Sequence, residues 1–328
     1  MPAVTLDSMT HSTSDATARL SAMADTLRKA ALSVLWRQWR AVGGQTAAKG
    51  TIQSIVDPEA LVLLSLAMAD DEPRLVDVLH DWTQLNADLL SVQRLKNLAP
   101  AYPTATAEHL AWLARLVTLE VKDQRWRSLC ASESAKSWDP EIRTNKRRAI
   151  RVRADSPATL ALRLRLGFGV GAKADVLTFL IGTSGDGATI RDIAGATGYT
   201  VAAVRRAAGD MADAGLLHVT AEQPVEFRAD AGAWGRVLGV GNEAPPWKHW
   251  QTRFGFLAAF LAWEEDARAK PVTAYVLGVK GRELLERHKP AFDRDRVAVW
   301  SEHTTIHDGL AFVEETVRKL AKWLVETG

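Results

Sequence analysis

The sequence has one cysteine, no long apolar run and almost no excess of charge. Cys130 alone cannot form an internal disulfide or a cysteine zinc cluster, which fits a reducing compartment. The longest apolar stretches, 60–64 and 256–263, are far shorter than the ~20 residues of a membrane helix. The N-terminal segment lacks the basic start and apolar core of a secretory signal. We therefore expect a cytoplasmic protein without a membrane partner.

The composition is that of a folded chain with more than one domain. The 328 residues exceed the ~150 of a usual domain. Apolar residues make up 47% of the chain, charged residues 24%, and the net charge is +2. These values exclude a wholly disordered chain or a generic polycation, and they name no partner.

The pattern along the chain predicts a mainly α fold in which five segments differ in character. Residues 1–15 are polar and predict a disordered tail. Apolar residues at helical spacing predict a helical N-terminal domain over 16–140. A basic connecting segment occupies 141–170, a compact unit 171–240, and a tryptophan-rich helical C-terminal domain 241–328.

The unit at 171–240 has the sharpest local signals. A first helix is expected over 174–181. Thr189 and Asp192 form a variant of the capping box at the start of a second helix, and Gly198 marks the turn after it. Thr200 is the expected N-cap of a third helix that ends at Gly215. Two short strand-like runs, 216–220 and 225–228, then predict a hairpin.

This unit resembles the winged helix-turn-helix domain of bacterial transcriptional regulators of the MarR and ArsR type. The resemblance rests on Ile190-Arg-Asp-Ile-Ala194, Thr197-Gly198-Tyr199-Thr200, Val201, Val204, Met211 and Ala214-Gly215-Leu216-Leu217. It implies three helices and a small β-hairpin between two helical domains. It also implies that the third helix, Thr200 to Ala214, enters the major groove of DNA and that the hairpin touches the backbone or minor groove.

A helical wheel assigns the faces of this third helix. Val201, Val204, Ala208 and Met211 turn inward, Ala202 and Arg206 outward, and Arg205 lies on the flank. The candidate DNA-contacting residues of the helix are Thr200, Ala202, Arg205 and Arg206. Asp210 counts against DNA because it can pair with Arg206 and repels phosphate. The hairpin also departs from the family pattern, since Glu222 and Glu226 make it acidic.

A second candidate DNA contact is the basic connecting segment. Residues 121–170 hold twelve Lys or Arg against five Asp or Glu, and a basic run beside a DNA-binding unit can hold phosphates. The candidate residues are Arg143, Lys146, Arg147, Arg148, Arg151 and Arg153. The run continues into Arg163 and Arg165, which alternate with leucines over 160–166. Strand and helix both remain open for that stretch.

Two features near the C-terminus have competing interpretations. His303 and His307 would share a helical face, with Asp308 beside them, but no third ligand of the same kind is spaced nearby and the glutamate of an HExxH motif is missing, so we expect no metal site. Ile306, Leu310, Val313, Val317, Leu320 and Leu324 form an a/d stripe. This stripe fits either packing within its own domain or a dimer helix. A homodimer would suit a regulator that binds paired half-sites.

These observations favour a sequence-specific DNA-binding transcriptional regulator whose partners are double-stranded DNA and a second copy of the chain. The alternative is a protein-interaction module, such as an antitoxin or assembly partner, which would bind a protein partner through the same unit. We expect no enzymatic activity and no cofactor.

Overall fold

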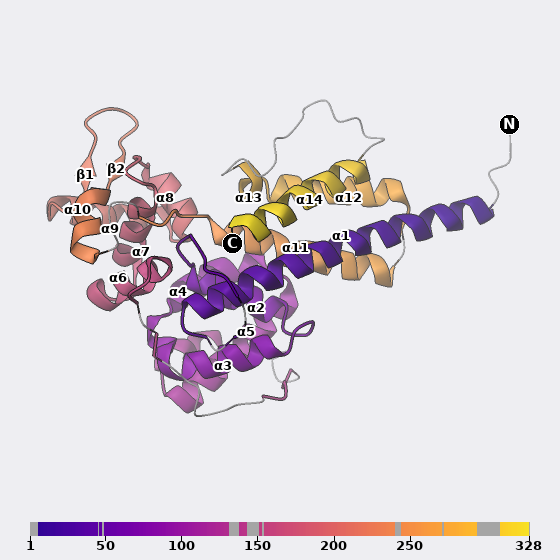
Figure 1. Ribbon diagram of the computed structural model, residues 1–328, viewed down its shortest axis with the longest axis horizontal. Coiled ribbons are helices and arrows are strands. Elements are labelled where there is room, and N and C mark those ends of the chain that lie inside the picture. Colours follow the sequence, from indigo (N-terminus) through magenta and orange to yellow (C-terminus); the bar gives the residue numbers. More distant parts are fainter. Residues whose placement is uncertain are drawn as a thin grey trace. The chain divides into compact units, whose positions relative to one another are not determined.

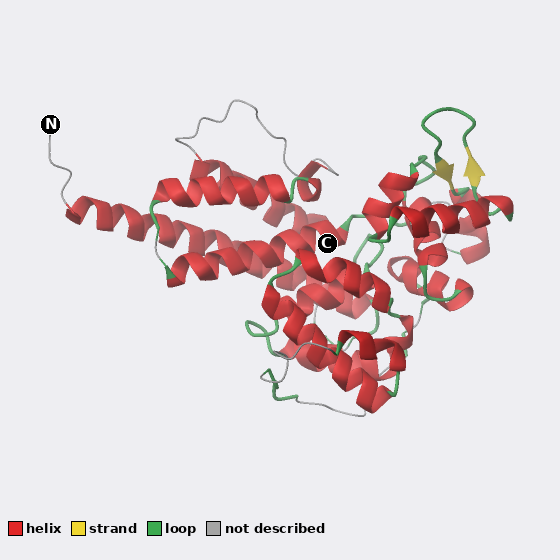
Figure 2. Cartoon of the chain, turned by 180° about the vertical axis from the view of Figure 1, so that it is seen from behind, coloured by secondary structure: helices red, strands yellow, loops and turns green. Residues whose placement is uncertain are grey.

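The computed structural model describes residues 6–44, 46–47, 49–130, 138–142, 151–152, 154–239, 244–270, 272–293 and 309–327, with side chains from residue 15 on. This part of the chain is mainly helical, as the sequence predicts, with one two-stranded sheet (Figures 1 and 2). It divides into two compact units. One consists of Met1–Leu35 and Thr252–Gly328, and the other of Trp36–Gln251.

These units do not follow the expected order of domains along the chain. Residues 16–35, expected in the N-terminal domain, belong to the unit of C-terminal helices. Residues 36–251 form one unit that contains both the remaining N-terminal helices and the segment 171–240. Helix α1 (Leu6–Ala41) begins within the expected disordered tail. The sequence signal was missing there because residues 7–15 are mostly polar and show no apolar periodicity.

The first unit is built from helices alone in its described part. They are the first part of α1, α11 (Trp250–Ala269, which begins in the other unit), α12 (Ala274–Arg287), the short α13 (Pro290–Asp293) and α14 (Gly309–Thr327). Phe256 and Phe292 pack edge to face with ring centroids 4.8 Å apart. Helices α12 and α14 approach closely, because a Cβ added to Gly278 would lie 3.1 Å from the backbone nitrogen of Leu310. These contacts contribute aromatic and aliphatic side chains to the core of the unit.

The apolar stripe on α14 is buried within this unit. Leu310, Val313, Val317, Leu320 and Leu324 are all at most 6% exposed, and a Cβ on Gly281 of α12 would lie 2.6 Å from Val313 Cγ2. Ile306, the first residue of the stripe, lies outside the described residues. Because this stripe packs inside its own unit, it is not a free dimer seam.

The stripe can be tested with two buried charges. Changing Val317 and Leu320 together to Asp should lower the free energy of unfolding by about 4 kcal/mol or more, because two unpaired carboxylates would enter the core. Urea unfolding followed by circular dichroism measures this loss. As a control, the double variant Lys319→Asp with Lys322→Asp introduces two aspartates at exposed positions of the same helix. A folded double variant that only loses an oligomer would contradict intramolecular packing.

The second unit begins with the end of α1 and a group of helices around α2 (Pro58–Ala67). Asp57 caps α2 by accepting a hydrogen bond from the Ala60 backbone N–H at 3.2 Å, and Pro58 occupies the first turn. Residues 58–66 are all buried, so α2 is the central helix of the group. Around it lie α3 (Arg74–Asn86), α4 (Val92–Leu98) and α5 (Thr104–Leu116).

Short helical turns connect these helices to one another and to the next part of the unit. They are η1 (Ala87–Leu89), η2 (Ala99–Ala101), η3 (Val117–Val121), η4 (Gln124–Leu129) and η6 (Pro157–Thr159). The run of alternating leucines and arginines, left open by the sequence, is helix α6 (Leu160–Phe168). Its burial is helical rather than alternating, since Leu164 and Arg165 are both buried.

The rest of the second unit is a group of helices with a small hairpin, drawn in pink and orange in Figure 1. It contains α7 (Ala172–Gly182), α8 (Ile190–Thr197), α9 (Val201–Asp213), β1 (His218–Val219), β2 (Phe227–Arg228) and α10 (Ala231–Leu238). The strands are antiparallel, with His218 opposite Arg228. Leu177, Ile193, Val204, Met211 and Phe227 belong to one buried cluster, which joins α7, α8, α9 and the hairpin.

The predicted local signals of this group are confirmed. Thr189 and Asp192 form a reciprocal capping box on α8, and Thr200 caps α9 by accepting a hydrogen bond from the Ala203 backbone N–H. Gly198 and Gly215 adopt φ angles of 72° and 70°, in the left-handed region that glycine favours at helix ends. The strands are shorter than the predicted runs.

Candidate functional site

Helix α9 has one buried apolar face and one exposed face that carries polar residues. Val204, Ala208 and Met211 are at most 2% exposed, while Ala202, Arg205 and Arg206 are exposed, as the helical wheel predicts. Thr200, the cap, is also exposed.

The prediction of the buried face is wrong for one residue, Val201. Val201 is 40% exposed, and Ala207 is buried at 4%. The first residue of a helix projects beyond the core that the next turns cover, so the wheel overestimates burial at that end.

The charges on this face divide along the helix. Arg205 and Arg206, in the first half, make no ion pair with any residue that the structure describes. Asp210, in the second half, pairs with Lys173 of α7 at 2.8 Å, not with Arg206 as the sequence suggested. Lys173 therefore neutralises the carboxylate and leaves the two guanidinium groups without an anionic partner on the described surface.

Several residues on the exposed face of α9 and on the neighbouring α8 have small side chains, so little side-chain volume covers the helix backbone there. A Cβ added to Gly209 of α9, or to Gly195 of α8, would meet nothing within 4 Å. Ala202 adds only a methyl group to this surface. A glycine inside a helix costs about 1 kcal/mol relative to alanine, and neither position needs it for local packing. The face allows another molecule to approach the backbone of α9 closely.

The surrounding surface is acidic. Residues 172–239 hold six Lys or Arg against eight Asp or Glu. In the hairpin, Arg228 lies 3.8 Å from Glu226, and Glu222 is exposed. Since the group as a whole is not basic, the two arginines of α9 are a local feature and not part of a general cationic coat.

The structure describes only one of the six candidate residues in the basic connecting segment. Arg143, Lys146, Arg147, Arg148 and Arg153 lie outside the described residues.

Arg151, the described one, donates to both carboxylate oxygens of Asp88, at 2.6 and 2.8 Å, and to the Leu85 carbonyl. The hydrogen bonds that Arg151 donates to the Asp88 carboxylate raise the pKa of Arg151. Its charge is already compensated within the chain.

Arg165, at the end of the basic run, belongs to a buried ionic network that no pattern in the sequence indicated. Its guanidinium binds Glu59 at 2.7 Å and Asp175 at 2.8 Å. Arg94 binds Asp57 at 2.7 Å and also contacts Glu59. All these side chains are at most 3% exposed. Arg165 is therefore in the core and is not a surface cation.

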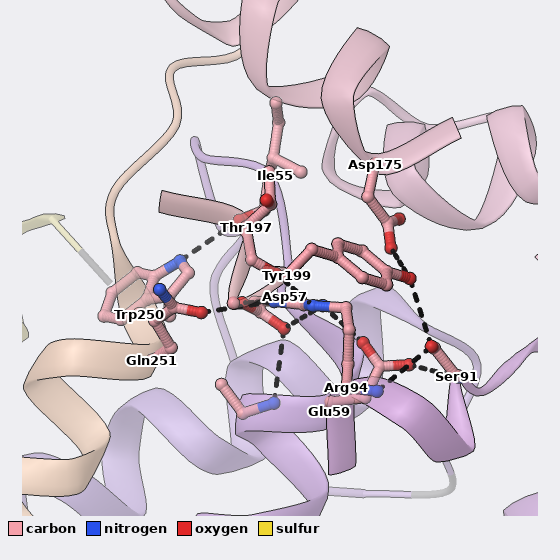
Figure 3. Close-up of polar contacts among 12 residues, drawn as sticks. Ile55, Asp57, Glu59, Ser91, Arg94, Asp175, Thr197, Tyr199, Trp250 and Gln251 are labelled. Atoms are coloured by element: carbon pink, nitrogen blue, oxygen red, sulfur yellow. Dashed lines mark hydrogen bonds and ion pairs between the residues drawn. The ribbon is translucent and has the colours of Figure 1, made fainter. Parts of the chain in front are cut away.

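Figure 3 shows how this network reaches the start of α9. Tyr199, which directly precedes the Thr200 cap, donates its hydroxyl proton to Asp175 at 2.9 Å and lies 3.1 Å from the Ser91 hydroxyl. Burial and the Asp175 carboxylate raise the pKa of Tyr199, so it remains a neutral donor. Asp175 thus links Arg165 to the turn before α9.

The network remains ionised because its members compensate one another. Burial alone would raise the pKa of Glu59, but the charges of Arg165 and Arg94 outweigh it and lower the pKa below 4.5. Burial would likewise lower the pKa of Arg94, but the carboxylates of Asp57, Glu59 and Asp175 raise it. Closed to solvent and mutually paired, these groups suit a structural role.

Three further comparisons bear on metal binding, on membrane spans and on similarity to known proteins. Within the described ranges, no three His, Cys, Asp or Glu side chains are placed to hold a metal ion, and His303 and His307 lie outside those ranges. None of the helices that the structure describes is long and apolar enough to span a bilayer. Comparison with protein-family models, curated proteins and solved structures finds no match for this chain.

The buried network makes the stability of this unit depend on Glu59. Glu59→Gln should lower the free energy of unfolding at pH 7 by about 3–5 kcal/mol, because Arg94 and Arg165 lose a charge partner in the core. Glu72→Gln, which breaks a surface pair with Arg74, should cost less than about 1 kcal/mol. Chemical denaturation of the two variants measures the difference. Equal losses would contradict the role of the buried network.

The network also gives a pH dependence with a definite sign. The pKa of Glu59 is lowered on folding, so the unfolded chain takes up the proton first. The stabilisation is fully present above the ordinary pKa of 4.5 and is lost as the pH falls below it. Unfolding measured from pH 7 down to pH 3 should show a steeper acid loss in the unmodified protein than in Glu59→Gln.

Proposed function

We propose that this protein is a sequence-specific DNA-binding transcriptional regulator. In this proposal α7, α8, α9 and the β1–β2 hairpin form a winged helix-turn-helix domain, and α9 is the recognition helix. The observation that carries the proposal is the exposed first half of α9, where Arg205 and Arg206 have no ionic partner among the described residues. Anions are the complement of that surface, and the acidic remainder of the group favours one defined contact.

The geometry of α9 suits the major groove. A groove ~12 Å wide admits one helix, and recognition helices contact base edges with their N-terminal residues. Ala202 and Gly209 would let the helix backbone approach the bases. Arg206, at the centre of the exposed face, would donate two hydrogen bonds to a guanine edge, and Arg205, on the flank, would contact a phosphate.

Positive charge outside α9 would supply the rest of the affinity. The helices and hairpin are net acidic, so phosphate binding would rest mainly on the basic segment 143–153. Arg151 would contribute less than its neighbours because Asp88 already holds its guanidinium. Regulators of this kind bind paired half-sites as dimers, and a homodimer remains part of the proposal, through a surface other than the buried stripe of α14.

A protein-binding module is the second candidate, and exposed apolar side chains favour it. Leu166, Phe168 and Val237 are 51%, 45% and 75% exposed, and Phe168 packs against Trp234 with centroids 6.0 Å apart. Such side chains, together with an acidic hairpin, suit a protein surface better than a nucleic acid. An antitoxin or assembly partner would use the unit in this way.

Titration with duplex DNA separates the two candidates. A DNA-binding protein should bind unrelated duplexes at ~50 mM salt, weaken steeply by ~200 mM, and enrich a preferred sequence from a random pool. The absence of binding at ~50 mM, or binding that ignores salt, would contradict the proposal and favour the protein-binding module.

A substitution on α9 tests the base contact. Arg206→Ala should weaken binding to the preferred sequence by about 1–3 kcal/mol and relax the preference at one base position, because a bidentate guanine contact is lost. Arg236→Ala is the matched control, since Arg236 is an exposed arginine on α10. Fluorescence anisotropy with single-base variants of the site measures both effects. If preference survives and only affinity falls, Arg206 is a phosphate contact.

A further inference from the structure

The turn between α8 and α9 is held by side chains from outside the helix-turn-helix unit. Arg94 Nε of α4 donates to the Thr197 carbonyl at 2.6 Å, and Asn97 Nδ2 of the same helix donates to the Gly198 carbonyl at 2.9 Å. Gln251 Nε2 of α11 donates to the Gly195 carbonyl at 2.5 Å. The last carbonyls of a helix have no partner within it. Gln251 and Arg94 satisfy two carbonyls in the last turn of α8, and Asn97 satisfies the carbonyl of its C-cap residue, Gly198.

The turn is also fixed by contact on its other atoms. A Cβ on Gly198 would lie 2.8 Å from Leu98 Cδ2 and 3.1 Å from Gln251 Oε1, so the backbone lies directly on α4. Tyr199, the next residue, is held through its hydroxyl by Asp175 and Ser91. Gly195, Thr197, Gly198 and Tyr199 are thus each bound by a side chain, and α9 begins two residues later at Val201.

We propose that α4 positions α9 on DNA, with Asn97 and Arg94 as the positioning residues. The inference rests on the proposed function and adds to it that the N-terminal helices take part in sequence recognition without touching DNA. A base-edge contact requires its side chain to be held within about 0.5 Å. Phosphate contacts by long cationic side chains tolerate larger shifts. Loosening the turn should therefore reduce sequence preference more than general affinity.

Asn97 is the residue on which to test this. Removing Arg94 would leave Asp57 without a charge partner in the core and Glu59 with Arg165 alone, so loss of folding would mask any effect on recognition. Asn97 is half-buried and carries no charge. Its amide accepts from Gln93 and donates to Gly198. Gln84 of α3 is a matched control, because it is also a half-buried amide, and its Nε2 contacts Glu120 at 2.8 Å and His80 Nε2 at 3.2 Å, away from α8 and α9.

The experiment compares Asn97→Ala and Gln84→Ala on two DNA duplexes, the preferred sequence selected with the unmodified protein and an unrelated sequence. For Asn97→Ala we expect the ratio of the two affinities to fall about tenfold, with an unchanged dependence of log affinity on log salt. Gln84→Ala should keep the ratio within about twofold. Hydrogen exchange should be faster at the amides of 198–203 in Asn97→Ala alone. Gly198→Ala, whose Cβ would collide with Leu98 of α4 and displace the same turn, should repeat the loss of preference.

The outcomes separate this inference from the function on which it rests. If the unmodified protein binds no DNA at ~50 mM salt, or selects no sequence, the proposed function fails and the positioning role fails with it. If the unmodified protein shows a preference that Asn97→Ala and Gly198→Ala keep, only the positioning role is overturned. A proportional loss on both duplexes, equal in Asn97→Ala and Gln84→Ala, would also overturn it, because it would follow from lowered stability alone.

Discussion

Two arginines and three carboxylates share the core of the second unit, and the surrounding helices depend on their pairing. A charge in an apolar interior is tolerated only when it is paired and hydrogen-bonded. Arg94 requires Asp57 and Glu59, and Arg165 requires Glu59 and Asp175. These residues come from α4, the start of α2, α6 and α7. None of these helices can shift without leaving a buried charge unpaired, so the network fixes their relative positions.

That constraint extends to the surface that we propose for DNA. Asp175 accepts the Tyr199 hydroxyl proton, and Arg94 donates to the carbonyl at the end of α8, so the charges that hold the core also hold the turn before α9. The exposed half of α9 then carries Arg205 and Arg206 on a helix whose start is capped and whose opposite face is buried. Rigid support of this kind is what base-edge contacts need. A protein-binding use of the same unit would need it less.

The basic run and the α14 stripe show why pattern alone misassigns some side chains. Arg151 and Arg165 are equivalent in sequence, as cations in one positive segment. One pairs with Asp88 at the surface and the other is enclosed by Glu59 and Asp175. Asp88 lies 63 positions from Arg151, and Glu59 lies 106 positions from Arg165. No local pattern marks pairs at such separations. The stripe on α14 is equally compatible with a neighbouring helix and a second subunit, because both bury the same face.

The sequence by itself determined the local structure of this protein. The Asp57 cap, the Thr189–Asp192 capping box, the Thr200 cap and the glycine turns at 198 and 215 follow from hydrogen bonds and backbone angles within a few residues. The tertiary structure alone decided which helices form each unit, which cations are buried and what holds the α8–α9 turn. Those outcomes depend on contacts between residues distant in sequence, such as Asn97 with Gly198. Only the folded chain brings such residues together.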